Sequence, residues 1–218
     1  MTLTKYKWRL SPDKLVVGLT GSPASGKSEV LSRFGELGAV SVSADGLVAA
    51  QLEKGRPGYK AVVKKYGKAA LSADKLDKIF LAEKVFFSPK DLRWLESVLH
   101  PLVLDEARRI INGARGVVVF EVPLLFEKEM EDWFDLTICV RASRPVRLAR
   151  AKQKGWSLRD FRSREAAQFS QEKKCSLAGI TLENSGGQQA LSALAEKIYA
   201  VLKTMKGTKK GAKNAKPS

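Results

Sequence analysis

The sequence contains little of what disulfide scaffolds, zinc sites and membrane segments are built from. It has two cysteines and one histidine in 218 residues, which excludes a disulfide scaffold and argues against a zinc centre. Its longest apolar runs are far shorter than the ~18 residues that a membrane helix needs. Residues 1–14 show no apolar segment typical of a secretory signal. No internal repeat is apparent. These absences favour a cytoplasmic protein.

What is present has the composition of a globular domain, with 44% hydrophobic and 28% charged residues. The length allows one domain with inserted subdomains. The net charge of +16 is unevenly distributed. Residues 141–174 carry eleven basic and three acidic residues, and residues 203–218 carry six lysines and no acid. Nucleic acid, an anionic membrane surface and a polyphosphate substrate are all compatible with such a distribution.

Apolar strands alternate with amphipathic helices along the chain, which predicts an α/β fold with helices on both faces of a parallel sheet. Strands are expected at residues 15–20, 39–42, 116–121, 136–140 and 180–182. Helices are expected after residue 26, ending at Gly38, and at residues 47–52, 59–66, 76–87, 89–111, 146–154, 158–174 and 190–205. Residues 59–112 show no clear strand, so the long helical block is interpreted as an insertion. Beyond Lys206 we expect disorder, because the segment has too little apolar surface to bury.

A phosphate-binding loop follows the first expected strand. The pattern G-x-x-x-x-G-K-[ST] is formed by Gly21, Ser22, Pro23, Ala24, Ser25, Gly26, Lys27 and Ser28. A chance match is disfavoured, because a strand precedes the pattern and a helix follows it. In such loops backbone N–H groups surround phosphate oxygens, so Lys27 is expected to reach the β- and γ-phosphates of ATP and Ser28 to hold Mg²⁺. Pro23 removes one of the N–H donors.

Two carboxylates are expected at the same edge of the sheet. Asp45 follows the second strand and suits either a general base for an attacking hydroxyl or the N-cap of the next helix. Position alone does not separate these roles. Glu121 closes a buried strand and is interpreted as a residue that orients water on Mg²⁺, the alternative being an ordinary acid at a strand end.

Seven arginines lie within residues 141–164. A solvated helix face is the common fate of such a run, but arginines on a closing lid also stabilise the charge of a transferred phosphoryl group. We interpret the segment as a lid. The single histidine, His100, has no nearby ligand partner and is interpreted as structural, and Cys139 as a buried core thiol.

The chain resembles the dephospho-coenzyme A kinase family over about residues 15–202. Several segments carry the resemblance: Leu19-Thr20-Gly21, Ala44-Asp45, Leu99-His100-Pro101, Val122-Pro123-Leu124-Leu125-Phe126-Glu127, Arg164-x-Ala166-Ala167-Gln168 and Glu183-Asn184-Ser185-Gly186. The phosphate loop is common to many NTPases, whereas P-L-L-F-E and L-H-P at these distances are more specific. The chain departs from the family at Pro23, Ser43, Ala49 and Gly179, and most of these departures concern acceptor contacts rather than the ATP site.

The resemblance implies a three-layer phosphate-loop kinase core with an inserted helical subdomain and a helical lid. Residues 1–14 are then an N-terminal extension, and residues 15–206 are a single kinase domain. Within it, residues 58–114 are the CoA-side insertion and residues 141–175 the lid, and residues 207–218 are a disordered basic tail.

The implied activity is transfer of the ATP γ-phosphate to the 3′-hydroxyl of dephospho-CoA, a small-molecule substrate. Asp45 would be the catalytic base, helped by Lys27, Arg150 and Arg164. The nucleotide would be held by residues 21–28 with Glu29 and Asn184, and Mg²⁺ by Ser28 and Glu121. The alternatives are another metabolite kinase of this fold, and a nucleic-acid-binding NTPase or non-catalytic binder suggested by the lysine tail. No basic patch interleaved with aromatic residues supports base stacking.

Overall fold

The structure is a computed structural model that describes residues 14–214, except for the side chains of Phe86 and residues 207–214. The described chain forms two compact units. We call residues 14–43 and 113–214 the core unit, and residues 44–112 the insertion unit. The sequence predicts an insertion over residues 58–114, whereas the second unit already begins at residue 44. Within the described residues, no helix combines the length and apolarity needed to cross a bilayer.

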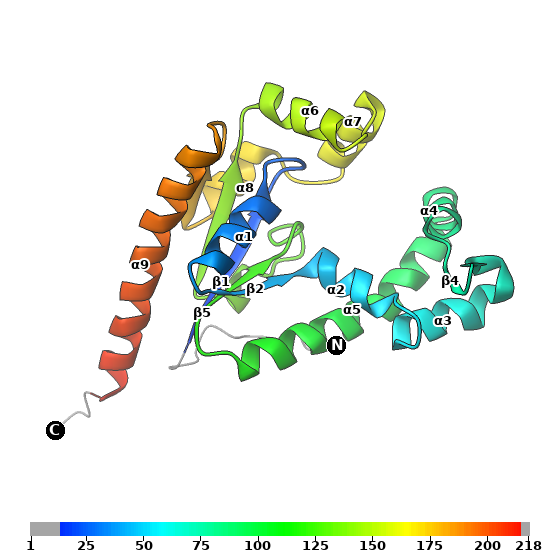
Figure 1. The fold of residues 1–218 in the computed structure, drawn as a ribbon, viewed down its shortest axis with the longest axis horizontal. Coiled ribbons are helices and arrows are strands. Elements are labelled where there is room, and N and C mark those ends of the chain that lie inside the picture. The colour runs from blue at the N-terminus through cyan, green and yellow to red at the C-terminus, as the bar shows by residue number, and fades with distance from the viewer. Residues whose placement is uncertain (1–13, 215–218) are drawn as a thin grey trace. The chain divides into compact units, whose positions relative to one another are not determined.

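A parallel five-stranded sheet in the order β2-β5-β1-β6-β7 forms the centre of the core unit (Figure 1). The strands are β1 (Lys14–Gly21), β2 (Val40–Ser43), β5 (Gly116–Glu121), β6 (Leu136–Arg141) and β7 (Ile180–Glu183). All eight residues of β1 are buried. Such burial is typical of a central strand that helices cover on both faces, and it explains why this strand is recognisable as a continuous apolar run. The structure confirms the predicted α/β fold with its parallel sheet.

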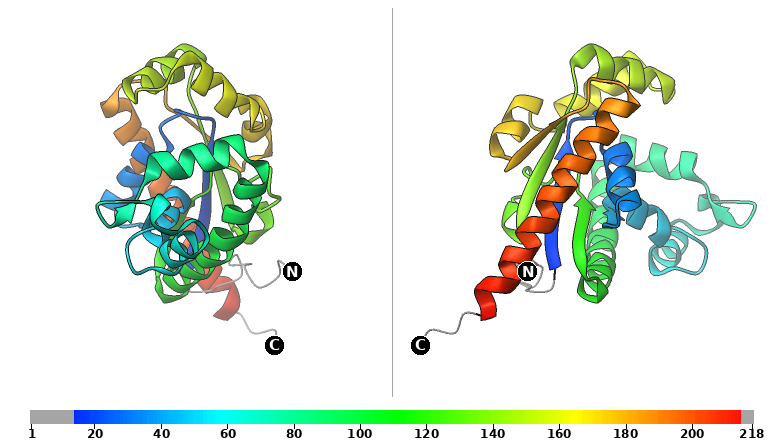
Figure 2. Two further views of the ribbon diagram at one scale, coloured as in Figure 1. Left: turned by 90° about the vertical axis from the view of Figure 1, so that its right-hand side faces the viewer. Right: turned by 60° about the vertical axis from the view of Figure 1, so that its left-hand side comes forward.

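One face of the sheet is covered by α1 (Lys27–Glu36) and α9 (Gln188–Asn214). Because side chains alternate along a strand, Leu15, Val17 and Leu19 point together into this layer. Phe34 of α1 and Leu202 of α9 are fully buried against them. Figure 2 shows the long α9 running along the strands.

The opposite face is covered by the segment after β5 and by α8 (Gln171–Leu177), which packs on β6 and β1. A Cβ atom at Gly18 would lie 2.6 Å from Leu125 Cδ1 and 2.9 Å from Phe134 Cδ2. Glycine is therefore needed in the middle of β1, because two large side chains rest directly on its backbone. The 3₁₀ turn η3 (Glu131–Trp133), α6 (Arg144–Gln153) and α7 (Leu158–Ala166) complete the core unit.

The insertion unit is mainly helical, as predicted. It contains α2 (Ala44–Gln51), α3 (Pro57–Tyr66), the 3₁₀ turn η2 (Gly67–Ala70), β3 (Leu71–Ser72), β4 (Lys75–Leu76), α4 (Lys78–Phe87) and α5 (Pro89–Gly113). Its small core forms around Val62, Ala70 and Leu81. The ring of Tyr66 contacts Phe80 and Trp94 edge-on, with centroids 5.8 and 5.7 Å apart. His100, interpreted from the sequence as structural, lies exposed on α5.

The prediction that residues 59–112 contain no strand is wrong. β3 and β4 form an antiparallel hairpin of two residues each. Ala73 and Asp74 turn the chain at φ values of 46° and 63°. The strands are too short for a two-residue periodicity to be detected, and the turn lacks the glycine that usually marks this conformation.

The single helix predicted over residues 158–174 is also wrong, because α7 ends at Ala166 and α8 begins at Gln171. The break is stabilised by a contact that is distant in sequence. Phe169 N–H donates to Glu127 Oε1 at 2.8 Å, and the Ser170 side chain then caps α8 by accepting from Lys173 N–H. Helical periodicity continues across this break and does not reveal it.

The C-terminal helix is longer than predicted. α9 continues to Asn214, so residues 207–214 are helical where we expected disorder. Three of these eight residues are lysines, which have good helix propensity, and a helix that is already formed extends at little cost even across two glycines. Residues 215–218 of the expected tail, and residues 1–13 of the expected N-terminal extension, lie outside the described residues.

Candidate active site

The phosphate loop joins β1 to α1 and is shaped by positive φ angles. Gly21 has φ 148°, Ala24 has φ 59° and Gly26 has φ 93°. A Cβ at Gly21 would lie 2.3 Å from Val140 O, and one at Gly26 would lie 2.1 Å from Asn184 Nδ2. Both glycines are therefore required by backbone angle and by space. Ala24 adopts the same left-handed region with a methyl group, which packs against Ala151 and Phe161.

The Lys27 ammonium is directed back over the loop. Its Nζ donates to Gly21 O and Ser22 O, both at 3.1 Å. Ser25 Oγ is buried and has no hydrogen-bond partner among the described residues. A cation above a concave loop, next to an unpartnered buried hydroxyl, is the arrangement that a phosphate group would complete. The loop predicted from the sequence is thus built as a phosphate cradle.

Arg150 and Asn184, both predicted from the sequence, come together at the end of this loop. Arg150 Nη1 donates to Ser25 O at 3.2 Å and Nη2 to Asn184 Oδ1 at 3.4 Å. Asn184 Nδ2 donates to Ser25 O at 2.9 Å. Asn184 follows β7 and Arg150 lies on α6, so two elements that are distant in sequence fix the same carbonyl.

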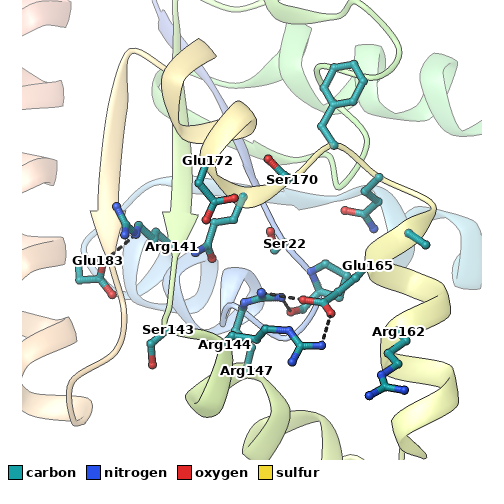
Figure 3. A pocket seen from close by; sticks show the side chains of 15 residues that line it. Ser22, Arg141, Ser143, Arg144, Arg147, Arg162, Glu165, Ser170, Glu172 and Glu183 are labelled. Carbon is teal, nitrogen blue, oxygen red and sulfur yellow. Dashed lines mark hydrogen bonds and ion pairs between the residues drawn. The ribbon is translucent and has the colours of Figure 1, made fainter.

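A cavity of about 630 Å³ opens beside the loop within the core unit. Ser22 and Pro23 form one wall, and the others come from the ends of β6 and β7, from α6 and α7, and from the start of α8 with the segment before it (Figure 3). The cavity is rich in cations, since Arg141, Arg144, Arg147 and Arg162 all line it. This basic lining suits a ligand with several negative charges.

Arg147 is the most buried of these arginines, with 5% of its surface exposed. Its Nη2 lies 2.7 Å from Glu165 Oε1, and its Nη1 donates to Pro23 O at 3.4 Å. Arg144 Nη2 meets the other oxygen of Glu165 at 3.1 Å, so two guanidinium groups share one carboxylate (Figure 3). Arg147 Nε is buried and unpartnered among the described residues. The pair therefore retains positive charge and a free donor at the cavity.

The structure does not bring the predicted Arg164 to this cavity. Its guanidinium stacks on Trp156, 4.4 Å from the ring centroid, and is exposed. Arg164 is absent from the residues that line the cavity, whereas Arg147 and Arg144 are present. Sequence reasoning missed these two. The available signal was that Arg144, Arg147 and Arg150 follow one another at intervals of three residues, which places them on one face of a helix.

Two oxygen-bearing side chains predicted to hold Mg²⁺ lie at the ends of core elements. Ser28 is exposed in the first turn of α1. Glu121 ends β5, is 4% exposed, and lies in register with Leu19 of β1 and Ser43 of β2. Among the described residues, no group of three or more His, Cys, Asp and Glu side chains could hold a metal. Hard oxygen donors in small number fit Mg²⁺, which usually keeps water and phosphate ligands.

Asp45 belongs to the insertion unit. α2 begins at Ala44, so Asp45 lies inside its first turn, and the interpretation as the N-cap of a helix beginning near Gly46 is wrong. Its exposed side chain lines a cavity of about 940 Å³ within this unit. Val48, Leu52 and Leu81 contribute apolar walls. Lysines 54, 75 and 78 also line the cavity.

A buried lysine that the sequence did not indicate connects two of the family-like segments. Lys174 is fully buried, and its Nζ contacts Pro123 O at 2.6 Å, Gln168 Oε1 at 2.8 Å and Glu127 Oε1 at 3.0 Å. Burial lowers the pKa of Lys174, and the Glu127 carboxylate opposes that shift. The Lys174 ammonium therefore connects the P-L-L-F-E segment with the segment from Arg164 to Gln168.

Comparisons with known proteins agree with these features. The sequence profile of the dephospho-CoA kinase family matches residues 15–190. A dephospho-CoA kinase of Mycolicibacterium paratuberculosis is 38% identical over 189 residues, covering 85% of this chain and 46% of the relative. One of Streptomyces avermitilis is 36% identical over 192 residues, covering 86% and 94%. A crystal structure from Thermus thermophilus superposes with a TM-score of 0.73 at 32% identity, covering 87% and 96%. The chain spans about half the length of the Mycolicibacterium relative and nearly all of the Streptomyces one.

Proposed function

The chain belongs to the dephospho-CoA kinase family, and from this premise we propose that it transfers the γ-phosphoryl group of ATP to the ribose 3′-hydroxyl of dephospho-CoA. The observation that carries the proposal is the phosphate loop, in which Lys27 lies over the cradle beside the unpartnered Ser25 hydroxyl. Phosphoryl transfer depends mainly on positioning and charge stabilisation, and the loop supplies both.

On the nucleotide side, the backbone N–H groups of the loop and the Lys27 ammonium bind the β- and γ-phosphates. Arg150 and Asn184 hold the end of the loop through Ser25 O, which orients the cradle. Glu29, in the first turn of α1, completes the proposed nucleotide-binding set.

Ser28 and Glu121 are the residues that would hold Mg²⁺, directly or through water. When bound there, Mg²⁺ neutralises charge on the β- and γ-phosphate oxygens. The Ser28 hydroxyl lies on the turn that follows Lys27, next to the phosphates that Lys27 binds. Glu121 is an acid at the end of a buried strand, where it would fix the orientation of metal-bound water.

On the acceptor side, Asp45 takes the proton of the attacking 3′-hydroxyl. The cavity that Asp45 lines supports this role, because its apolar walls suit the uncharged arm of dephospho-CoA. Lys75 and Lys78 at the same cavity suit the diphosphate of the acceptor. In the core unit, Arg144 and Arg147 face the loop and would stabilise the charge of the transferred group.

The proposal is tested by measuring ADP formation by the full chain with Mg-ATP and a panel of acceptors. The panel contains dephospho-CoA, adenosine, shikimate and single-stranded DNA. We expect dephospho-CoA to stimulate ADP formation far more than the others. Preference for another small acceptor would favour a different kinase activity, and stimulation by DNA alone would favour a nucleic-acid-dependent NTPase.

Lys27→Ala is the matched control for the assay. It removes the cation that neutralises developing charge and should abolish transfer, while its circular dichroism spectrum and melting temperature stay near those of the parent chain. Lys27 is partly exposed, and its ammonium donates to the carbonyls of Gly21 and Ser22 at the surface of the loop, so we expect the core to stay intact in this variant. Near-parental turnover in this variant would contradict the proposal.

A further inference from the structure

The chain's two cysteines, which the proposed activity does not use, lie against each other. Cys139 is in β6 and Cys175 in α8, 36 residues apart in sequence. Their sulfur atoms are 3.0 Å apart, and both thiols are free. A disulfide bond needs a separation of ~2.0 Å, so side-chain rotations that bring the sulfurs ~1 Å closer would form it. The contact joins two elements that already pack together.

The two thiols differ in access to reagents. Cys139 is fully buried in β6, with Thr20 of β1 as its partner in the sheet register. Burial raises the pKa of the Cys139 thiol well above its ordinary value, and the nearby Lys174 and Lys27 oppose the shift. Cys175 is partly exposed. An oxidant from solution therefore meets Cys175 first, and Cys139 is placed to react with Cys175 rather than with the oxidant.

We propose that Cys139 and Cys175 form a redox-active pair that a low-mass disulfide converts into an intramolecular disulfide. The Cys175 thiolate attacks one sulfur of the reagent, R–S–S–R, and one RS⁻ leaves. Cys139 then loses its proton and attacks Cys175 Sγ, and the second RS⁻ leaves. Both leaving groups take up the protons that the cysteines gave. The two protein thiols are oxidised, and one reagent disulfide is reduced to two thiols.

The bond would link α8 covalently to the central sheet. α8 carries the buried Lys174 and also Gln171, whose Oε1 accepts from Ala142 N–H at 3.1 Å. Ser170, Gln171 and Glu172 line the arginine-rich cavity. Oxidation should therefore restrict the local opening of α8 and of that cavity wall. The inference does not depend on which reaction the protein catalyses.

The test uses the reduced full chain and 2-hydroxyethyl disulfide as the oxidant. After acid quenching and unfolding, we expect both thiols to be lost and the intact mass to fall by two hydrogen atoms, with no interchain species on a non-reducing gel. The oxidised chain should melt at higher temperature than the reduced chain, because the bond closes a long loop. Amide hydrogens of α8 should exchange more slowly.

Single variants separate the two thiols. Cys139→Ser should stop at the hydroxyethyl mixed disulfide on Cys175, because the second thiol is missing. Cys175→Ser should keep its buried Cys139 thiol unreacted in the folded state. Because a hydroxyl at position 139 would disturb the core, Cys139→Ala is measured beside Cys139→Ser. If neither of these two variants folds, the parent chain and Cys175→Ser together decide the outcome. The proposal would be overturned if the parent chain, after incubation with the reagent, kept both thiols, carried a stable reagent adduct, or formed an interchain disulfide.

Discussion

The lysine and arginine side chains around the phosphate loop direct their charged groups toward its carbonyl oxygens. Lys27 binds Gly21 O and Ser22 O, Arg147 approaches Pro23 O, and Arg150 binds Ser25 O. Three positive charges therefore surround a loop of eight residues. A triphosphate brings negative charge to this loop, and under the proposed function the three cations would stabilise the charge that spreads over the transferred phosphoryl oxygens during reaction.

Asp45 is the residue whose role decides whether the proposed chemistry has a base. Asp45→Asn keeps the shape and one hydrogen-bonding oxygen but cannot take a proton. We expect turnover to fall by ~10²–10⁴-fold, since general-base catalysis is typically worth that much. The melting temperature and ATP affinity should stay near the parental values, because Asp45 is exposed. Steady-state kinetics with dephospho-CoA and a thermal melt measure both.

Asp74→Asn is the matched control, because Asp74 is exposed and lines the same cavity of the insertion unit. It removes a carboxylate of equal charge at some cost to an exposed ion pair with Lys54, which is worth little. If both variants lose turnover equally, the loss reflects cavity charge. If Asp45→Asn keeps the turnover of the parent chain, Asp45 is not the base.

Arg147 and Arg164 test which arginines of the basic segment act at the site. The structure places Arg147 at the cavity, whereas the sequence favoured Arg164. Arg147→Ala should lower turnover by ~10²-fold, as removal of one buried charge-stabilising donor typically does. Arg164→Ala removes only an exposed stacking contact with Trp156 and should leave turnover nearly unchanged. Assays at saturating ATP, with melting curves for each variant, make the comparison. The reverse ranking would show that the segment rearranges before reaction.

Sequence reasoning finds the residues whose role is encoded locally. Lys27 and Ser28 follow from an eight-residue pattern, Asn184 from a family resemblance, and Arg150 from the arginine-rich segment interpreted as a lid. Arg147 and Lys174 were missed, and each makes a hydrogen bond to a residue far away in sequence, at 124 and 51 residues. Nothing in a local window distinguishes a lysine that will be buried against a carboxylate from the exposed lysines around it.

Helix α8 shows how one buried cation organises several segments. Lys174 holds a carbonyl of the P-L-L-F-E segment, the Glu127 carboxylate and the Gln168 amide at once. Pro123 O also accepts from Thr20 Oγ1 of β1 at 3.1 Å. The segment after β5, the end of α7 and the start of α8 are therefore fixed relative to the sheet by hydrogen bonds rather than by apolar packing alone.

Lys174→Met tests this organisation. The substitution leaves the Glu127 carboxylate, which has little exposure, without its cation, and breaking a buried pair in this way costs about 3–5 kcal/mol. We expect a corresponding loss in the free energy of unfolding measured with urea. The double variant Lys174→Met with Glu127→Gln should recover part of it, because the unpaired charge is gone.

Lys173→Met is the neighbouring control. Lys173 is exposed, and its ammonium lies over the Phe169 ring, 3.5 Å from the centroid, a contact worth ~1 kcal/mol or less at an exposed site. A loss at Lys173 equal to that at Lys174, or no recovery in the double variant, would mean that the buried pair is not what stabilises α8.

Elements were predictable where burial is periodic and were not where a turn or a distant contact ends them. β5 was predicted at Gly116–Glu121 and is found there, since a fully buried parallel strand has an unmistakable apolar run. The hairpin β3–β4 and the break before α8 were missed. The first depends on left-handed residues without glycine, and the second on a bond from Glu127.

At the scale of the whole molecule, we expect the basic C-terminal end, residues 207–218, to be separable from the fold. Leu202 is the last residue of α9 in the core cluster. Deleting residues 207–218 should therefore leave the melting temperature and turnover within error of the parent chain. It should weaken salt-sensitive binding to anionic vesicles or nucleic acid, because it removes four lysines.

Two results of the same deletion would contradict this expectation. If the truncated chain melts at a much lower temperature, then the end of α9 packs on the fold. If it loses turnover with its stability intact, the basic end takes part in substrate binding. Replacing its lysines by glutamine in the full-length chain separates the effect of charge from that of helix length.

The most direct test of the central claim is the position of the transferred phosphate. The full chain is incubated with Mg²⁺, ATP labelled in the γ-phosphate and dephospho-CoA, and the product is identified by mass spectrometry and ³¹P NMR. The account predicts a labelled phosphomonoester on the ribose 3′-oxygen, and no labelled product from the 3′-deoxy analogue of the acceptor. Label released only as inorganic phosphate, or found on any other atom of the acceptor, would contradict it.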